Sequence, residues 1–576
     1  MIAALVIWVY ILFLGYLYGW QSTRLLERHF LPSSPKTLSP SITWITGLAV
    51  ITTIASLFSL ISKIGLLLNI ILLIGAAIII LRHRANLLPP ADNLMTTLRK
   101  PIGTLLGLLV FLSVLTIATG SPANPDTGLY HAQAIRWIET FPAVLGLGNL
   151  HTRLAYNSSW LVANATFSFS FLGLQSFRLL PGALYLIALL NIYAGIARQV
   201  ARRPYLSDYA RLALLPFAFM MLGAEVSSPG TDLPAALLTW MILLEWGAVL
   251  ERNPFSQATA VDIRPVLLTL LGIFTLTVKL STVSLLLGAA CPLFYWLKTR
   301  QTRPILTLGL LSLMLISPWF ARNVMLSGYL VYPVPSIDLF NPDWKIPLEI
   351  TEEDRDTARS WARPRQPWQT NEETLAMPPQ KWIPIWFIGL SPLRRAIMIF
   401  IAAAPFGYAL VALILRKRLS TVWTRLRPYL FPIAMAYSGL LYWFWAAPLF
   451  RYGTAFILSC LALMLLPPVA ALKPLVTKKT SQLGPAVLLA GLLAFQAFFL
   501  SRTLNFENPL LPADYLALPT RPCELYNFTA WCAESWDACY YEPFPCVPRA
   551  DPYTSLRGDN LQEGFFYNSP NSPTPK

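Results

Sequence analysis

A polar stretch follows an apolar segment and carries several side chains that can do chemistry. Residues 122–137 read PANPDTGLYHAQAIRW and bring Asp126, Tyr130 and His131 close together. A carboxylate can take a proton from a hydroxyl group as a general base, and Tyr and His side chains can bind polar groups of a substrate. Asp is also a favoured N-cap, so the alternative is that Asp126 only caps a helix that begins near Thr127.

Other ionisable side chains lie at the ends of apolar segments. Cations in such a set would stabilise the charge on a leaving phosphate, while one carboxylate would accept a proton. These residue types therefore suit the transfer of a group from a lipid phosphate. Basic residues near helix ends also snorkel to lipid headgroups, which is the alternative for each of them alone. The candidate substrate-binding residues are Tyr130, His131, Glu225, Asp232, Lys279, Arg322 and Arg451.

The histidines do not form a recognisable metal site. His131 and His151 have no second ligand at helical spacing, so both are expected to be hydrogen-bonded structural residues. The need for a divalent metal is left open, because no ligand spacing supports one, and no cofactor is assigned.

Long apolar blocks must position these side chains. The chain of 576 residues is 55% hydrophobic and only 12% charged, whereas soluble domains carry about a quarter charged residues. A membrane-spanning helix needs roughly 20 mostly apolar residues. The sequence therefore predicts an all-α polytopic membrane protein whose first block is a retained helix rather than a signal peptide. About fourteen crossings are expected, at residues 2–20, 42–62, 65–81, 101–119, 179–197, 209–224, 233–250, 266–278, 282–297, 305–320, 396–415, 430–445, 453–472 and 485–500.

The basic residues predict how these helices are oriented. The net charge is +16, and the Lys and Arg residues lie in six short groups between apolar blocks. Such groups are typical of cytoplasmic loops and do not favour nucleic-acid binding. With all six inside, both termini and the candidate residues are expected on the outer face of the membrane. The groups are Arg24, Arg28 and Lys36; Arg82, Arg84, Arg99 and Lys100; Arg198, Arg202, Arg203 and Arg211; Lys298, Arg300 and Arg303; Arg416, Lys417, Arg418, Arg425 and Arg427; and Lys473, Lys478 and Lys479.

Long polar segments are expected outside, at residues 120–178 and 321–395 and after the last block. The mixed-charge run at 349–365 is either a mobile lid or acceptor-binding loop, or a solvated loop with no special role. Residues 164–173 are apolar and are expected to form an interfacial or re-entrant helix. The expected domains are N-terminal helices at 1–100, a transmembrane core at 101–501 and a periplasmic Cys-containing tail at 502–576.

Four cysteines follow the last apolar block. Their spacing lacks the C-x-x-C pattern of a zinc site, so they predict two disulfides with three possible connectivities. Disulfides require an oxidising compartment such as the periplasm, which agrees with the side assigned from the basic residues. The candidates are Cys523, Cys532, Cys539 and Cys546.

Four of these stretches resemble motifs of the GT-C superfamily of polytopic membrane glycosyltransferases. PDTGLYHAQAIRW is similar to the first external loop of that superfamily, with Asp126 at its catalytic acidic residue and Tyr130 and Ala134 also matching. LTVKLSTVSLLLG places Lys279 at the lysine of a turn between two short helices. SPWFARNVMLSGYLVYP and FWAAPLFRYG resemble two later stretches, and Arg451 occupies the position of an arginine in the second.

The chain also resembles a family of bacterial multi-pass membrane proteins with no assigned activity, which share DTGLYHAQAIRWIE, RLAYNSSW and a tail like CELYNFTAWC. Three features depart from the GT-C pattern. Asp126 is followed by Thr127 rather than Glu, which argues against a metal site built on two carboxylates. Lys279 is followed by Leu-Ser rather than Gly-Pro. Three apolar blocks precede the block before the Asp126 loop, where the superfamily core usually begins with one.

The resemblance implies a glycosyltransferase of the bacterial inner membrane with Asp126 as the general base. Its partners would be membrane lipid, a donor sugar linked to polyprenyl phosphate and a periplasmic acceptor, with no nucleic acid. The expected contacts are Lys279, Arg322 and Arg451 with the donor phosphate, and Glu225 or Asp232 with acceptor hydroxyls.

Two other classes of function compete with a transferase. A transporter or flippase for lipid-linked glycans would predict internal repeats and charged residues near the bilayer midplane. The sequence shows no clear repeat, and Glu245, the nearest such charge, lies close to the cytoplasmic end of its block. A non-catalytic assembly protein of a surface-polysaccharide system would keep the transferase fold without the activity.

Overall fold

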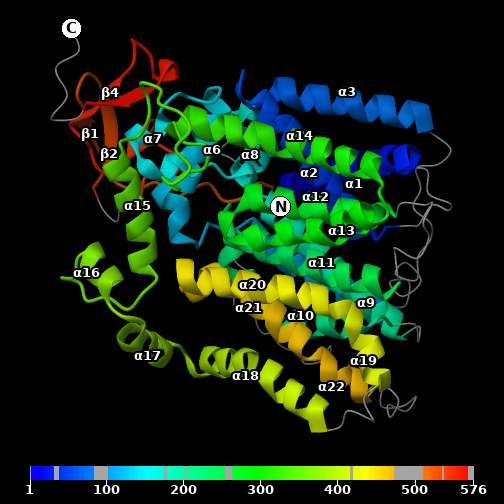
Figure 1. Ribbon diagram of the computed structural model, residues 1–576. Helices are drawn as coiled ribbons and strands as arrows, with labels where there is room; N and C mark the ends of the chain where they lie inside the picture. The colour runs from blue at the N-terminus through cyan, green and yellow to red at the C-terminus, as the bar shows by residue number, and fades with distance from the viewer. Residues whose placement is uncertain are drawn as a thin grey trace.

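The apolar blocks of the sequence form helices throughout the part of the chain that the structure describes. The computed structural model describes residues 2–30, 38–83, 101–173, 175, 178–200, 204–252, 262–414, 420–472, 510–534 and 537–568. The predicted crossing at 485–500 therefore lies outside the described residues. The long and short helices of the body (Figure 1) are α1 (Ile2–Phe30), α2 (Pro40–Phe58), α3 (Leu66–His83), α5 (Pro101–Ala118), α9 (Leu180–Val200), α10 (Leu206–Glu225), α11 (Asp232–Glu251), α12 (Ile263–Val278), α13 (Ala290–Lys298), α14 (Thr302–Ser327), α18 (Pro392–Ile414), α19 (Ser420–Leu426), α20 (Leu430–Ala446), α21 (Phe450–Met464) and α22 (Leu466–Leu472).

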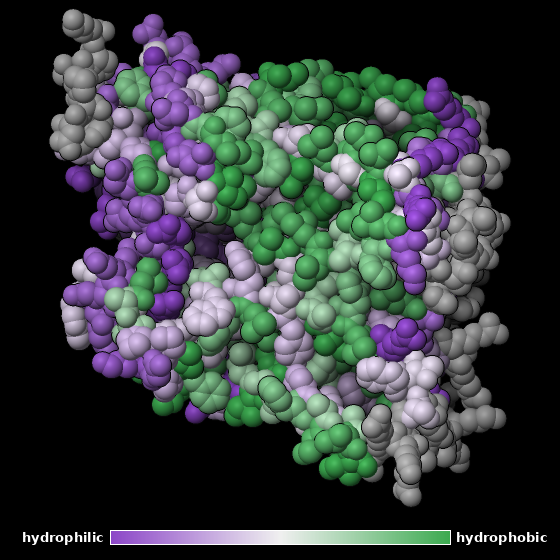
Figure 2. Space-filling model, viewed as in Figure 1, coloured by the Kyte–Doolittle hydropathy of each residue, from purple (hydrophilic) through white to green (hydrophobic). Residues whose placement is uncertain are grey.

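Nine helices within the described residues are long and apolar enough to cross a membrane. Large apolar side chains on them face outward, such as Ile74, Met314 and Leu413, which are 56%, 67% and 73% exposed. Water-soluble proteins rarely expose contiguous apolar surface. Figure 2 shows a wide hydrophobic zone that separates a hydrophilic end of the molecule from a hydrophilic margin on the other side. These features support the prediction of a helical membrane protein.

Helices α1 and α2 approach each other closely because glycines line their contact. A Cβ atom added at Gly19 would lie 1.8 Å from the carbonyl oxygen of Thr43, and one added at Gly47 would lie 1.8 Å from that of Gly15. Small residues allow such approach between helices in a membrane. The glycines of the sequence thus set the close packing of α1 against α2.

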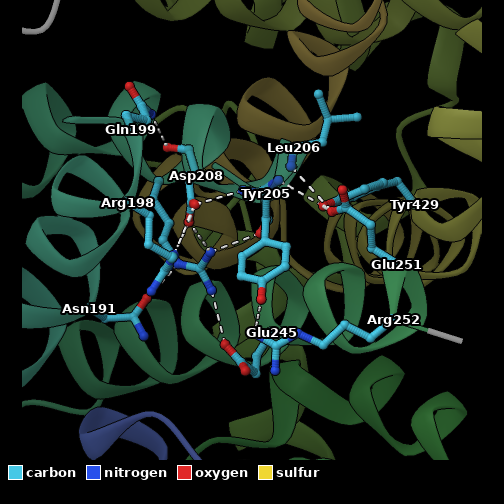
Figure 3. A network of polar contacts seen from close by, with 12 residues as sticks. Asn191, Arg198, Gln199, Tyr205, Leu206, Asp208, Glu245, Glu251, Arg252 and Tyr429 are labelled. Carbon is cyan, nitrogen blue, oxygen red and sulfur yellow. Dashed lines mark hydrogen bonds and ion pairs between the residues drawn. The ribbon is translucent and has the colours of Figure 1, made fainter. Parts of the chain in front are cut away.

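Buried ion pairs join three helices at the end of the body away from the strands (Figure 3). The side chains of Asp208 and Arg211 in α10 are 0% and 1% exposed, and Nη1 of Arg211 lies 2.8 Å from Oδ1 of Asp208. Arg198 of α9 also donates to Asp208, and Nη2 of Arg211 lies 3.0 Å from Oε2 of Glu245 in α11. Buried charges persist in proteins when they are paired, so this network fixes α9, α10 and α11 relative to one another.

Several basic groups that the sequence assigned to one side of the membrane are neighbours. Arg303 donates to the backbone oxygen of His29, at the end of α1. Arg425 donates to the backbone oxygen of Ala470, near the end of α22. The members of these groups that lie outside the described residues are Lys36, Arg84, Arg99, Lys100, Arg202, Arg203, Arg416, Lys417, Arg418, Lys473, Lys478 and Lys479.

Lys279 lies where the expected pair of short helices meets. Helix α12 ends at Val278, and Lys279 is extended, with φ of −154° and ψ of 124°. The chain then forms a 3-10 helix, η5 (Leu280–Ala289), which continues into α13. Together Leu280–Lys298 make one of the nine apolar helical segments.

The long polar segments also contain helices. The mixed-charge run forms α15 (Leu348–Trp361), which is followed by α16 (Asn371–Ala376) and α17 (Pro379–Gly389). Asp354 of α15 accepts hydrogen bonds from Tyr332 at 3.1 Å and from Thr152 at 3.4 Å. The run is therefore a helix tied to the first polar segment rather than a solvated loop. The apolar stretch at 164–173 is divided between α8 (Ser159–Thr166) and a short turn, η4 (Ser170–Leu172).

The tail forms small sheets rather than helices, which corrects the all-α prediction for this part of the chain. Its two disulfides are Cys523–Cys532 and Cys539–Cys546, so the predicted disulfides are confirmed with one connectivity. Strand β2 pairs antiparallel with β1 and parallel with β3, and β4 pairs antiparallel with β5. A tail with few apolar residues gains stability from such staples. The strands are β1 (Thr520–Glu524), β2 (Thr529–Ala533), β3 (Cys546–Val547), β4 (Thr554–Leu556) and β5 (Phe565–Tyr567).

Candidate active site

The segment that carries Asp126 has an unusual helical geometry. Residues Thr127–His131 form a π-helix, η2, which continues as α6 (Ala132–Thr140). Single π-helical turns occur frequently at functional sites. The Asp126 carboxylate makes no capping hydrogen bond to this helix. Instead its Oδ2 accepts a hydrogen bond from Nη2 of Arg451 at 2.8 Å, so the capping interpretation of Asp126 is wrong.

Four of the predicted residues form one connected set of charges, which we name the charge cluster: Asp126, Asp232, Lys279 and Arg451. Nε of Arg451 lies 3.2 Å from Oδ2 of Asp232, and the ammonium group of Lys279 forms an ion pair with the same carboxylate. Asp232 begins α11, Arg451 lies in the first turn of α21, and Lys279 joins α12 to η5. Ends of separate helices thus meet at one place.

The side chains of the charge cluster are partly buried and partly exposed to solvent. The side chains of Asp126 and Arg451 are 25% and 34% exposed, while that of Asp232 is 11% exposed. Two carboxylates face two cations, so the formal charges of the cluster cancel. Partial burial strengthens electrostatic interactions relative to water, and the open side of Asp126 leaves room for another molecule to approach its carboxylate.

Glu225 lies beside the charge cluster but outside its ion pairs. Nδ2 of Asn124 donates to Oε2 of Glu225 at 3.2 Å, and the Asn124 side-chain oxygen accepts from the backbone N–H of Asp126 at 3.0 Å. Asn124 therefore links the carboxylate of Glu225 to the turn that carries Asp126. The backbone N–H of Asn124 also donates to Ser228 at 3.1 Å, which fixes the loop between α10 and α11 against that turn.

His131 is buried, and neither of its ring nitrogens has a hydrogen-bond partner within the described residues. Burial lowers the pKa of His131 to about 4, and the positive charges of Arg451 and Lys279 act in the same direction against the two carboxylates. The ring is therefore neutral near pH 7. Tyr130 packs on it with ring centroids 4.2 Å apart. Unpaired buried polar atoms are rare and costly, so His131 departs from the expectation that it is a hydrogen-bonded structural residue.

Arg322 is not part of the charge cluster in the described structure. It is 4% exposed and donates to Oδ1 of Asn157 at 3.2 Å and to Oγ of Ser59 at 2.8 Å. It lines a small cavity of about 20 Å³ together with Trp137 and Leu326. The structure thus brings Asp126, Asp232, Lys279 and Arg451 together and places Arg322 with a different set of partners.

Arg153 is a cation that the sequence did not single out. Its guanidinium lies 6.0 Å from the ring centroid of Tyr130 and 5.9 Å from that of Tyr156. Within the described residues it forms no hydrogen bond or ion pair with a side chain or backbone group. Its neighbours Thr152 and Tyr332 contact Asp354 of α15, and Figure 2 shows a hydrophilic recess beside that helix. The only hint in the sequence was its place in the shared stretch RLAYNSSW.

Within the described residues, no group of three or more His, Cys, Asp or Glu side chains is arranged to hold a metal ion. Comparison with known protein families finds a match over most of the chain. The model of a family described as a domain of unknown function, DUF8201, matches residues 1–458. No curated protein and no solved structure matches the chain.

Proposed function

The chain belongs to the DUF8201 family, and from its charge cluster we propose that it is a membrane glycosyltransferase of the GT-C type. It transfers a sugar from a polyprenyl-phosphate donor to an acceptor hydroxyl outside the cytoplasm. The ion pair between Asp126 and Arg451 carries this proposal. It joins the residue that resembles the catalytic acid of that superfamily to a cation expected at the donor phosphate.

In the proposed reaction, the acceptor hydroxyl gives its proton to the Asp126 carboxylate. The acceptor oxygen forms a bond to the anomeric carbon of the sugar. The bond between that carbon and the donor phosphate oxygen breaks, and the phosphate leaves with the bonding electrons. Phosphate is a good leaving group, so one base and several cations are sufficient for this chemistry.

Three cations are suited to the donor phosphate. Lys279 and Arg451 are already paired with carboxylates, so an incoming phosphate competes with Asp126 for Arg451 and frees that carboxylate to act as a base. Within the described residues, Arg153 is held by the rings of Tyr130 and Tyr156 rather than by a direct ion pair, so a phosphate oxygen would not have to displace a bound carboxylate. Arginine suits this role because its planar donors match phosphate geometry.

The proposal includes a location. We infer about fourteen crossings in the bacterial inner membrane, with both termini and the charge cluster on the periplasmic side. Support comes from the positions of the basic groups and from the disulfides of the tail, which require an oxidising compartment. The buried charges nearest the middle of a helix, Arg211 and Glu245, are paired with each other, so they do not favour the transporter alternative.

Transfer can be tested with the full chain in lipid nanodiscs. The donor pool is an extract of polyprenyl-linked sugars, radiolabelled in the sugar, from the organism's own membranes. A transferase releases label from the lipid fraction and leaves unlabelled polyprenyl phosphate. Label that stays on an intact lipid but crosses the bilayer of a vesicle would instead establish a flippase. No release with any extract and acceptor fraction would contradict the proposed transfer.

A further inference from the structure

The loop closed by the Cys539–Cys546 disulfide packs directly on the π-helical turn after Asp126. The backbone oxygen of Gly128 accepts hydrogen bonds from the N–H groups of Cys539 at 2.8 Å and Tyr540 at 3.0 Å. A Cβ atom added at Gly128 would lie 2.6 Å from the ring of Tyr540. A side chain at this position would clash with Tyr540. Glycine therefore allows the backbone of the turn to lie close to the loop.

Gln133 anchors the same loop one turn further along α6. Its amide nitrogen donates to the backbone oxygens of Tyr540 at 3.0 Å and Pro543 at 2.9 Å. Its side-chain oxygen accepts from the N–H of Cys546 at 3.2 Å. Gln133 is 2% exposed, so these bonds form away from water, where an unmade partner is costly. Both ends of the disulfide loop are therefore held by the segment that carries Asp126.

Two further side chains of α6 reach the loop. Arg136 donates to the backbone oxygen of Tyr541 at 2.6 Å and pairs with Glu542 at 2.5 Å. The hydroxyl of Tyr541 donates to Glu139 at 2.7 Å. The tail thus contacts η2 and α6 at several positions along their length, and it covers this side of both elements.

The loop also holds a backbone conformation that is unfavourable for its residue type. Tyr540 has a φ of 51°, in the left-handed region. A bulky residue is unfavourable there and persists when the surroundings impose it. The disulfide and the two bonds to Gly128 supply those surroundings.

We infer that the Cys539–Cys546 loop is a positioning element of the active site, and that Gln133 is its anchoring residue. The loop holds η2 so that the carboxylate of Asp126 faces Arg451, Lys279 and the incoming substrate. This inference rests on the proposed function for its effect on rate. Independently of any activity, the loop rigidifies residues 127–140. The loop lies outside residues 1–458, which the family model matches.

The second disulfide provides a matched control within the same tail. Cys523–Cys532 joins β1 to β2. The strand hydrogen bonds nearest to it run to β1 and to Pro545, which lies inside the Cys539–Cys546 loop. Removing either pair deletes one disulfide from the tail, but only the Cys539–Cys546 pair closes the loop on Gly128 and Gln133.

The test compares the C539S/C546S and C523S/C532S double variants of the full chain in nanodiscs, with Gln133→Met as a third variant. Hydrogen–deuterium exchange of residues 127–140 is measured first. We expect exchange there to rise about tenfold or more in C539S/C546S and in Gln133→Met, with little change in C523S/C532S. In the transfer assay, kcat should fall on the order of tenfold to a hundredfold in the first two variants, while the KM for donor changes little.

Each outcome decides the inference. Wild-type exchange and kcat in C539S/C546S would overturn it. Equal effects of the two disulfide pairs would also overturn it, because they would indicate a tail that only folds as a whole. If the wild-type chain transfers no sugar, the proposed function fails, and the exchange data alone decide whether the loop rigidifies the turn.

Discussion

Nη2 of Arg451 lies 2.8 Å from Oδ2 of Asp126, although the two residues are 325 positions apart in the sequence. The pair exists because the first turn of α21 and the start of η2 meet at the same end of the helical body. It connects two residues that lie at positions resembling GT-C motifs, and it places a cation directly on the proposed base.

The first prediction concerns Asp126. Asp126→Asn keeps the size of the side chain and removes the basic carboxylate, so we expect transfer to fall on the order of a hundredfold or more. Because the carboxylate makes no capping bond and its partner Arg451 keeps Asp232 as a second carboxylate, thermal stability in detergent should change little. The control is Asp338→Asn, which removes an exposed carboxylate that pairs with Lys345 in the long polar segment. Full activity of Asp126→Asn would exclude it as the base.

The second prediction concerns the pair of Lys279 and Asp232. Lys279→Met deletes the cation and keeps the apolar stem, so the KM for donor should rise about tenfold with a smaller change in kcat. Asp232→Asn should cost less in the Lys279→Met background than alone. A double-mutant cycle should give a coupling of roughly 0.5–3 kcal/mol, as expected for residues in contact. Strict additivity would show that the ion pair does not contribute to donor binding.

The third prediction is a pH dependence of stability. The pKa of His131 is about 4 in the folded protein, whereas unfolded His has a pKa of about 6.5. Between these values the unfolded state binds a proton that the folded state does not, so stability must fall as pH falls through this window. The thermal midpoint should drop less between pH 7.5 and 5 in His131→Asn than in the wild type. His29→Asn, at an exposed position, should leave the drop unchanged.

The fourth prediction concerns the buried network at the far end of the body. Arg211→Met leaves Glu245 without its partner and Asp208 with only Arg198, and breaking a buried pair costs roughly 3–5 kcal/mol. We expect a clearly lower midpoint of thermal unfolding. The exposed Arg252→Met should have little effect. Equal midpoints for the two variants would mean that the network does not hold α9, α10 and α11 together.

The fifth prediction is the orientation in the membrane. Single cysteines placed at Ser121 and Gln369, on a background without the tail cysteines, should react with an impermeant maleimide in intact spheroplasts. A cysteine at Arg300 should react only after lysis, because it belongs to a basic group expected inside. The reverse pattern would place the charge cluster in the cytoplasm and remove lipid-linked donors as its natural substrates.

Much of the fold could be predicted from the sequence, because each of these features depends on residues within one short segment. Apolar length predicted the helices, the position of Lys279 between two blocks predicted the junction of α12 and η5, and the four tail cysteines predicted two disulfides. The choice of partners was not readable. Nothing near Gln133 in the sequence indicates what it contacts, because its partners come from a segment more than 400 positions away. Arg153 contacts the nearer Tyr130 and Tyr156, but residue spacing alone does not show that the chain folds these side chains together.

The same limit explains where the structure departs from these expectations. Asp126 has the sequence context of an N-cap, and only the distant Arg451 draws its carboxylate away from the helix. Arg322 has the context of a residue at a membrane interface, yet Asn157 and Ser59 hold it among other buried groups. The tail has too few long apolar runs for helices, and a disulfide joins two of its paired short strands, β1 and β2.

The contact between Gln133 and Tyr540 also sets an order of events during synthesis. The two residues are separated by 407 positions, so at about 5–20 residues per second the loop is made roughly 20–80 s after the turn that it covers. Until then the site-bearing segment lacks its outer cover, and a chain cut short before the tail never acquires it. The Cys539–Cys546 loop, which is made and oxidised after the turn, is thus required to complete the site, and a product truncated before it would hold the charged residues of the site without the means to align them.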